Sequence, residues 1–218
     1  MDLIYKFNDG GIFMWVILVM GVLAAAIAFE RVFYVVFRAN INATAFMAQI
    51  QKLIMANNID RAIKLCNAEP NAALPKVVKA GLTRANRTEK EIENAIDEAT
   101  LEVVPQINKR TPYLNMLANV STLTGLLGTI QGLIQAFDAV ANAPADLKQA
   151  MLASGIAVAM YTTFAGLVVA IPILMVFSYI SNRANKILDD VDQYGLKTVN
   201  LLTARKRGTL KEDAAAEG

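Results

Sequence analysis

The chain has 218 residues, 55% of them hydrophobic, and it carries a net charge of +2. Its charged fraction of 18% lies below the roughly 25% of ordinary soluble domains, and so small a net charge argues against nucleic-acid binding. One cysteine excludes a disulfide framework within the chain, and the absence of histidine removes the usual metal ligand and neutral-pH base. Since there is no nucleophile–base set or phosphate-binding loop either, we expect no metal, no cofactor and no enzymatic activity.

Three apolar stretches are each long enough to cross a bilayer, which takes about 20 residues. They are Gly11–Phe29, Leu114–Ala141 and Gly155–Ser181. We therefore expect an all-α integral membrane protein with three transmembrane helices and long cytoplasmic helical extensions. The expected segments are a periplasmic N-terminus (1–10), the first transmembrane helix with its extension (11–39), a cytoplasmic helical segment (40–112), the second transmembrane helix (113–141), a short periplasmic connection (142–154), the third transmembrane helix (155–181) and a cytoplasmic C-terminal helix and tail (182–218).

The distribution of basic residues predicts the orientation, because Lys and Arg concentrate on the cytoplasmic side of membrane spans. Lys6 precedes the first span and Lys148 lies between the second and third, whereas nearly all other bases fall within residues 31–110 or after residue 181. The N-terminus is therefore expected to be periplasmic and the C-terminus cytoplasmic. Met1–Gly11 lacks the basic region and cleavage site of a signal peptide, so we expect the first span to be a retained anchor.

The cytoplasmic segment is predicted to be wholly helical. Thr88 and Glu91 fit a capping box that opens a helix over Glu89–Lys109. At the cytoplasmic end of the first span, Glu30 and Arg31 form a membrane-boundary pair, which either joins the two charges or anchors the span in the interface.

The third span is predicted to continue into a cytoplasmic helix. Pro172 frees the carbonyl of Val168 and should bend this helix, either as a packing kink or as part of a gate. Beyond residue 181 an apolar side is expected, formed by Ile187, Leu188, Val191, Leu196 and Leu201. The charged, Ala-rich segment Lys211–Gly218 is expected to be disordered.

Small and hydroxyl residues recur at helical spacing within the second and third spans, so each set lies on one helix face. In the second span these are Thr122, Gly125, Thr129 and Gly132, with Gly128 forming a small-xxx-small pair with Gly132. In the third they are Ala159, Thr163, Gly166 and Ala170, with Thr162 alongside. Faces of this kind let neighbouring helices approach closely.

Thr129 and Thr163 are predicted to lie at similar depths. They are about 12 and 8 residues from the outer ends of their spans, which differ in depth by only about 6 Å at about 1.5 Å per residue. The two hydroxyls fit one polar ring if the helices are neighbours around an axis. The alternative is packing alone, since threonines in membrane helices often bond only their own i−4 carbonyl.

Two strings around these residues resemble the signature helices of the ExbB/TolQ/MotA proton-channel family. They are Thr124–Phe137, which contains Gly-Leu-Leu-Gly-Thr, and Gly155–Pro172, which contains Thr-x-x-Gly-Leu-x-x-Ala-Ile-Pro. Glu30-Arg31 at the end of the first span is also typical, and the three-span layout is closer to ExbB and TolQ than to the four-span flagellar stators. The resemblance implies an inner-membrane motor subunit that forms a homo-oligomer, with a pentamer expected.

The resemblance also implies the partners and the site. The second and third helices would line a pore around a single-span ExbD/TolR-like protein, whose intramembrane aspartate takes up the ion. A TonB/TolA-like protein would be a further partner. Thr129 and Thr163 align with the family's pore threonines; Thr122 and Thr162 add further hydroxyls to the ion pathway. Val158 stands where many ExbB and TolQ proteins have glutamate.

The function implied is coupling of the ion motive force to envelope work such as TonB-dependent transport. The spans offer almost no acid of their own, because Asp138 lies near the outer end of its helix, roughly opposite Thr122 and Thr129. Since an ion-coupled path needs a titratable group within the membrane, we predict an obligatory partner that supplies one. The alternatives are a passive membrane scaffold, which would tolerate replacement of the threonines, and an autonomous ion channel.

Overall fold

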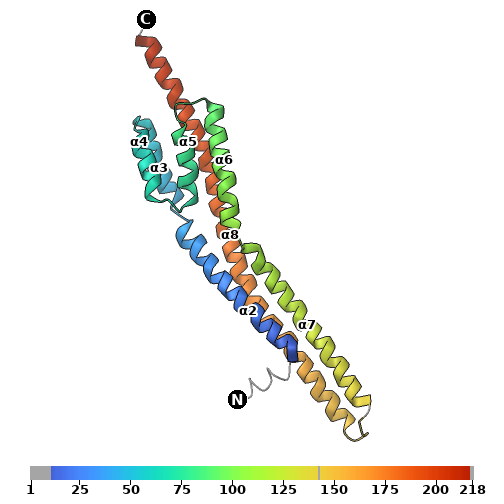
Figure 1. The fold of residues 1–218 in the computed structure, drawn as a ribbon. Coiled ribbons are helices and arrows are strands. Elements are labelled where there is room, and N and C mark those ends of the chain that lie inside the picture. The colour runs from blue at the N-terminus through green and yellow to red at the C-terminus, as the bar shows by residue number, and fades with distance from the viewer. Residues whose placement is uncertain (1–10, 142, 217–218) are drawn as a thin grey trace. The chain divides into compact units, whose positions relative to one another are not determined.

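The computed structural model describes residues 11–141 and 143–216. All regular secondary structure in these ranges is helical (Figure 1). The elements are α2 (Gly11–Val32), the π-helix η1 (Phe33–Arg38), α3 (Ala43–Met55), α4 (Ile59–Ala68), α5 (Ala73–Thr83), α6 (Glu89–Asn108), α7 (Thr111–Ala141) and α8 (Lys148–Ala216). Three helical stretches that include α2, α7 and the first part of α8 are long and apolar enough to cross a membrane. The predicted all-α membrane class is thus confirmed, while the predicted N-terminal segment 1–10 lies outside the described residues.

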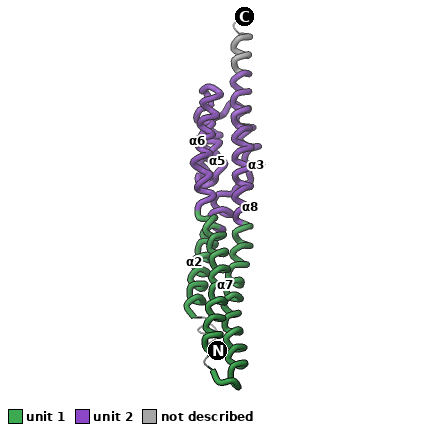
Figure 2. Tube along the Cα trace, turned by 90° about the vertical axis from the view of Figure 1, so that its right-hand side faces the viewer, with its two compact units in different colours: residues 1–31, 110–179 green, residues 32–109, 180–218 purple. Residues whose placement is uncertain are grey.

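The chain divides into two compact units (Figure 2). Unit 1 contains residues 1–31 and 110–179, and therefore holds most of α2, all of α7 and the first part of α8. Unit 2 contains residues 32–109 and 180–218, and holds η1, α3 to α6 and the remainder of α8.

In unit 1, α2 buries one face and exposes apolar side chains over the rest of its surface. Met14, Ile17 and Ala24 are buried, and a Cβ added at Gly21 would lie 3.2 Å from Val169 of α8. Ile12, Val22 and other large apolar side chains are more than half exposed. An exposed apolar surface of this extent suits a helix surrounded by lipid, because the bilayer core is as apolar as these side chains.

Helix α7 begins two residues before the predicted span. Arg110, which precedes it, has a φ of 61°, in the left-handed region that ends regular helix. Pro112 then lies in the first turn of α7, where the missing N–H has no helical partner to lose.

Helix α8 begins at Lys148, so the second half of the expected connection 142–154 is helical. A turn in which the Leu147 N–H donates to the carbonyl of Pro144 at 3.0 Å precedes that start.

Unit 2 is a helical bundle with an apolar core. The capping box predicted at Thr88 and Glu91 is present at the start of α6. Ile96 of α6 lies at the centre of the bundle: a Cβ added at Gly81 of α5 would be 2.7 Å from its Cδ1, and one added at Gly195 of α8 would be 3.1 Å from its Cγ2. Ile92, Val103 and Ile107 of the same helix are also buried.

Two features of unit 2 differ from expectation. Leu196 is 65% exposed instead of contributing to the buried side of α8. The same helix continues to Ala216, through most of the segment predicted to be disordered, because its Ala-rich composition favours helix.

Candidate functional site between α7 and α8

Close approach between α7 and the first part of α8 creates the candidate site in unit 1. A Cβ added at Gly125 would lie 2.9 Å from the carbonyl oxygen of Thr162, and one added at Gly166 would lie 2.8 Å from that of Ser121. At Gly132 the added atom would lie 2.8 Å from the Cβ of Ala159. The small-residue faces predicted on the two helices therefore face each other, and the glycines leave no room for side chains between the backbones.

The hydroxyls of Thr129 and Thr163 contact each other across this interface. Each also lies 3.1 Å from the carbonyl oxygen of Gly125, to which it can donate. The expectation that these two threonines lie at one depth is therefore confirmed within a single chain.

Thr162 joins the same group from the next position of α8. Its hydroxyl lies 3.2 Å from the Gly125 carbonyl and 2.7 Å from that of Ala159, and its side chain is buried. A Cβ added at Gly128 would lie 2.8 Å from this hydroxyl oxygen. The Thr162 side chain therefore fits here only because position 128 is glycine.

Thr122 does not join the cluster. Its hydroxyl donates to its own i−4 carbonyl, that of Ala118, at 3.1 Å, which is the local bonding expected of a packing residue. Ser121, one residue earlier, was not singled out from the sequence, yet it is fully buried and donates across the interface to the Gly166 carbonyl at 3.4 Å. Its spacing of four and seven residues from Gly125 and Gly128 places it on the same helix face, and this spacing could have identified it from the sequence.

Three hydroxyls compete for the carbonyl oxygen of Gly125. Thr129, Thr162 and Thr163 each carry one hydroxyl hydrogen, and a carbonyl oxygen offers two lone pairs. Since the Gly125 carbonyl is within 3.2 Å of all three hydroxyl oxygens, not every contact is satisfied at once. At most two of the three hydroxyls donate to this carbonyl at one time, and Thr162 has a second acceptor in the Ala159 carbonyl at 2.7 Å.

The remaining predicted residues lie at other points of unit 1. Ala159 and Ala170 of α8 are buried, whereas Pro172 is exposed within a helix that continues through it. At the end of α2, Arg31 is buried, and Glu30 forms an ion pair with Arg110, a partner that sequence reasoning did not find because the two are 80 positions apart.

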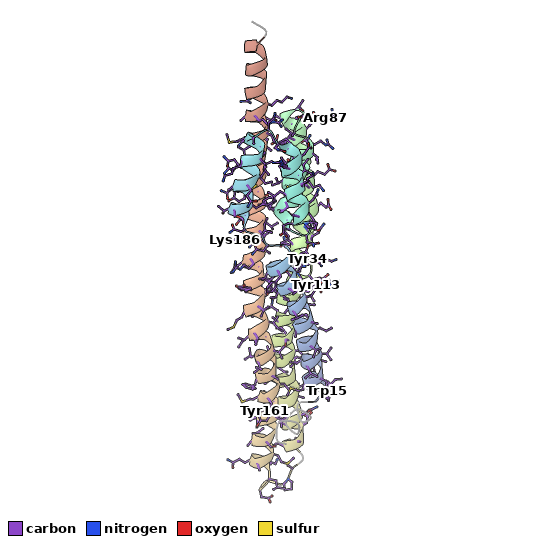
Figure 3. All side chains as sticks on the ribbon, turned by 90° about the vertical axis from the view of Figure 1, so that its left-hand side faces the viewer. Trp15, Tyr34, Arg87, Tyr113, Tyr161 and Lys186 are labelled. Atoms are coloured by element: carbon purple, nitrogen blue, oxygen red, sulfur yellow. The ribbon has the colours of Figure 1, made fainter. Side chains whose placement is uncertain are left out.

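The charge content of unit 1 limits what the site can do alone. Within the described parts of α7, and of α8 up to Tyr179, the ionisable carboxylates and bases are limited to Asp138 and Lys148, and Asp138 is exposed near the end of α7. No group of three or more metal-binding side chains occurs in the described residues. Figure 3 labels Trp15 of α2, Tyr113 of α7 and Tyr161 of α8. The site thus offers hydroxyls and no acid among the threonines.

Comparison with known proteins gives the family. Residues 69–193 match the model of the MotA/TolQ/ExbB proton channel family. An ExbB homolog described as a biopolymer transport protein of Methanothermobacter thermautotrophicus is 23% identical over 186 residues, which cover 85% of this chain and 65% of the relative.

Two further relatives match the chain over shorter regions. The biopolymer transport protein exbB1 of Vibrio cholerae is 38% identical over 44% of this chain and 42% of its own length. The Tol-Pal system protein TolQ of Haemophilus influenzae is 36% identical over 46% of this chain and 43% of its own length. The chain thus spans less than two thirds of the length of each of these relatives. The family match includes α6, α7 and the part of α8 that carries the threonines, and this chain belongs to the MotA/TolQ/ExbB proton channel family.

Proposed function

We propose that this chain is the ExbB/TolQ-like subunit of an inner-membrane motor that couples the ion motive force to work at the cell envelope. Family membership and the three apolar helices support a multi-pass inner-membrane protein. The names of two relatives point to biopolymer transport and to the Tol-Pal system. In this proposal the N-terminus is periplasmic and the C-terminus cytoplasmic, as the distribution of bases favours.

The observation that carries the proposal is the hydroxyl cluster of Thr129, Thr162 and Thr163 around the Gly125 carbonyl. Hydroxyls donate and accept hydrogen bonds but do not change charge near neutral pH, so they cannot take up and release a proton themselves. They are well suited to hold a carboxylate, or the water beside it, that a partner presents. Hydrogen bonds from hydroxyls to a charged oxygen are stronger than those between neutral groups.

The partner is therefore proposed to be a single-span ExbD/TolR-like protein with an aspartate inside the membrane. A homo-oligomer, with a pentamer expected, would arrange α7 and α8 of each copy around that span. A TonB/TolA-like protein would receive the work. One copy with a single α7–α8 face cannot enclose a polar path, which supports an oligomer independently of its stoichiometry.

The test is affinity purification of the full chain from its native membrane, followed by mass spectrometry of the intact assembly and of the proteins that copurify. The expected result is a homo-oligomer that holds a single-span protein with an aspartate within its span. A homo-oligomer that conducts ions without a partner would favour an autonomous channel. A monomer without such a partner would leave the threonine cluster as packing, as a passive scaffold requires.

A further inference from the structure

An open groove lies in unit 2 between the end of α3 and the C-terminal part of α8. Its volume is about 360 Å³. From α3 and the turn after it the groove is lined by Ile54, Met55 and Asn57, and from α8 by Leu201, Ala204 and Arg205. The groove is thus apolar with one base, and no carboxylate is among its described lining residues.

The way in which α3 ends explains why the groove is open. The Asn58 N–H donates to the Leu53 carbonyl at 2.9 Å and the Asn57 N–H to that of Ile54 at 3.0 Å, while Asn57 has a φ of 56°. This is a Schellman motif, which stops the helix at Met55. Helix α8 continues to Ala216, and a Cβ added at Gly208 would meet nothing within 4 Å. The surface of α8 past the end of α3 is therefore left uncovered.

The apolar part of the groove combines a buried and an exposed side chain. Ile54 is 1% exposed, whereas Met55 next to it is 75% exposed. Unit 2 holds the segment expected in the cytoplasm, where water and not lipid would surround Met55. Large apolar side chains exposed beside a groove mark interaction sites, and methionine adapts its flexible side chain to the surface of a partner.

The base of the groove differs from the two bases that follow it in the chain. Lys206 donates to the Arg87 carbonyl at 3.3 Å, and Arg207 forms an ion pair with Glu89. Arg205 is half-buried, and its guanidinium has no hydrogen bond or ion pair among the residues that the structure describes. A half-buried guanidinium without a counterion costs free energy, and a carboxylate is the group that it binds most favourably, through two parallel hydrogen bonds.

We propose that this groove docks an acidic peptide segment of another protein, one that presents an apolar side chain next to an aspartate or glutamate. The apolar side chain packs on Ile54, Met55 and Leu201, and the carboxylate pairs with Arg205. Charge complementarity selects this occupant, because the groove supplies a base and no acid of its own. The inference concerns unit 2 and does not depend on the ion coupling proposed for unit 1.

The test is peptide binding to the purified full chain, measured by fluorescence anisotropy. The probe is a fluorescein-labelled, alanine-based helical peptide with leucines at positions i and i+4 and a glutamate beside each, and its counterpart has glutamine in place of glutamate. We expect the glutamate peptide to bind about tenfold or more tightly than the glutamine peptide, since hydrogen bonds to charged groups are the stronger ones. Failure of the glutamate peptide to bind, or equal binding of the two, would overturn the proposal.

Variants then locate the binding. Arg205→Gln should remove the preference for the glutamate peptide, and Met55→Ser should weaken both peptides by about tenfold. Lys206→Gln and Leu196→Ser, which alter a neighbouring base and an exposed leucine outside the groove, are the matched controls and should keep both properties. A preference that persists in Arg205→Gln would overturn the proposal. Since Arg205 has no partner and Met55 is exposed, both variants should unfold at the temperature of the unaltered chain.

Two further outcomes would assign the groove to a different occupant and so overturn the proposal. Loss of a homo-oligomer in Arg205→Gln or Met55→Ser, seen in the native mass, would show that a second copy fills the groove. A gain of about tenfold or more in affinity for the glutamate peptide after removal of residues 209–218 would show that the chain's own C-terminal segment competes for it.

Discussion

The hydroxyls of Thr129 and Thr163 contact each other across the α7–α8 interface, and each lies 3.1 Å from the same carbonyl oxygen, that of Gly125. Two side chains 34 positions apart in the sequence are thus held on one acceptor by a glycine that lets the helices meet. Removing a hydroxyl and removing the glycine therefore have different expected consequences, one for function and one for assembly.

Replacement of Thr129 or Thr163 by valine is expected to lower ion-coupled activity strongly while the complex still assembles. Valine has nearly the same shape but no hydroxyl, and a hydrogen bond to a charged group contributes about 1.5–3 kcal/mol, which corresponds to a loss of roughly tenfold to a hundredfold. Ion flux and copurification with the partner measure the two effects separately. Thr129→Ser and Thr163→Ser keep the hydroxyl and should retain activity, and a valine variant with normal flux would favour the scaffold.

Replacement of Gly125 by alanine is expected to destabilise the packing of α7 against α8. The added Cβ would lie 2.9 Å from the Thr162 carbonyl oxygen and 3.2 Å from the Cα of Thr163, both backbone atoms that cannot rotate away. Overpacking of this kind costs about 1–3 kcal/mol. Thermal unfolding of the purified protein in detergent measures it, and Gly208→Ala, where a Cβ meets nothing within 4 Å, is the matched control. Equal thermal stability of the two variants would contradict the close approach.

The ion pair between Glu30 and Arg110 is expected to contribute little to the free energy of unfolding. Their side chains are 48% and 46% exposed, and exposed pairs contribute about 0–1 kcal/mol because solvent screens the charges. A double-mutant cycle with Glu30→Gln and Arg110→Gln, read by thermal unfolding, measures the coupling. The same cycle with Lys148→Gln should give none, because distant sites are additive. A coupling well above this range would indicate that the pair is buried in the assembly.

The capping box of α6 is expected to stabilise unit 2 in a pH-dependent way. The Thr88 N–H and hydroxyl donate to the Glu91 carboxylate at 3.0 and 2.7 Å, and these bonds lower the pKa of Glu91 from its ordinary value of 4.5. Because the folded pKa is the lower one, the contribution of the carboxylate is present above the unfolded pKa and is lost as the pH falls through the folded pKa.

Thr88→Ala is therefore expected to cost about 1 kcal/mol at neutral pH, the usual effect of losing an N-cap side chain. The difference from the unaltered protein should shrink in acid, below the ordinary pKa of Glu91. Thermal unfolding between neutral pH and pH about 3 measures this. Glu91→Gln, which cannot ionise, should remove the pH-dependent part, and a difference that grows in acid would contradict the assigned bonding.

Cys66 is expected to resist alkylation in the folded protein. Its side chain is 2% exposed, and burial raises the pKa of the thiol to about 11, so little reactive thiolate forms near neutral pH. Iodoacetamide at pH about 8, followed by intact-mass measurement, should modify the chain only after denaturation. Rapid modification of the native protein would show that α4 opens readily.

Local patterns in the sequence predicted the helices and the residue faces, because both depend on neighbours a few positions apart. The apolar stretches predicted three spans, Thr88 and Glu91 predicted the start of α6, and the spacing of Gly125, Thr129 and Gly132 placed them on one face. The threonines were also found from sequence, since small and hydroxyl residues stand out in an otherwise apolar span.

What needed the tertiary structure were contacts between positions far apart in the chain. Glu30 with Arg110, Ser121 with the Gly166 carbonyl, and the three hydroxyls around Gly125 depend on how α2, α7 and α8 pack. Sequence periodicity determines which face of a helix is polar or small, and only packing decides what that face meets.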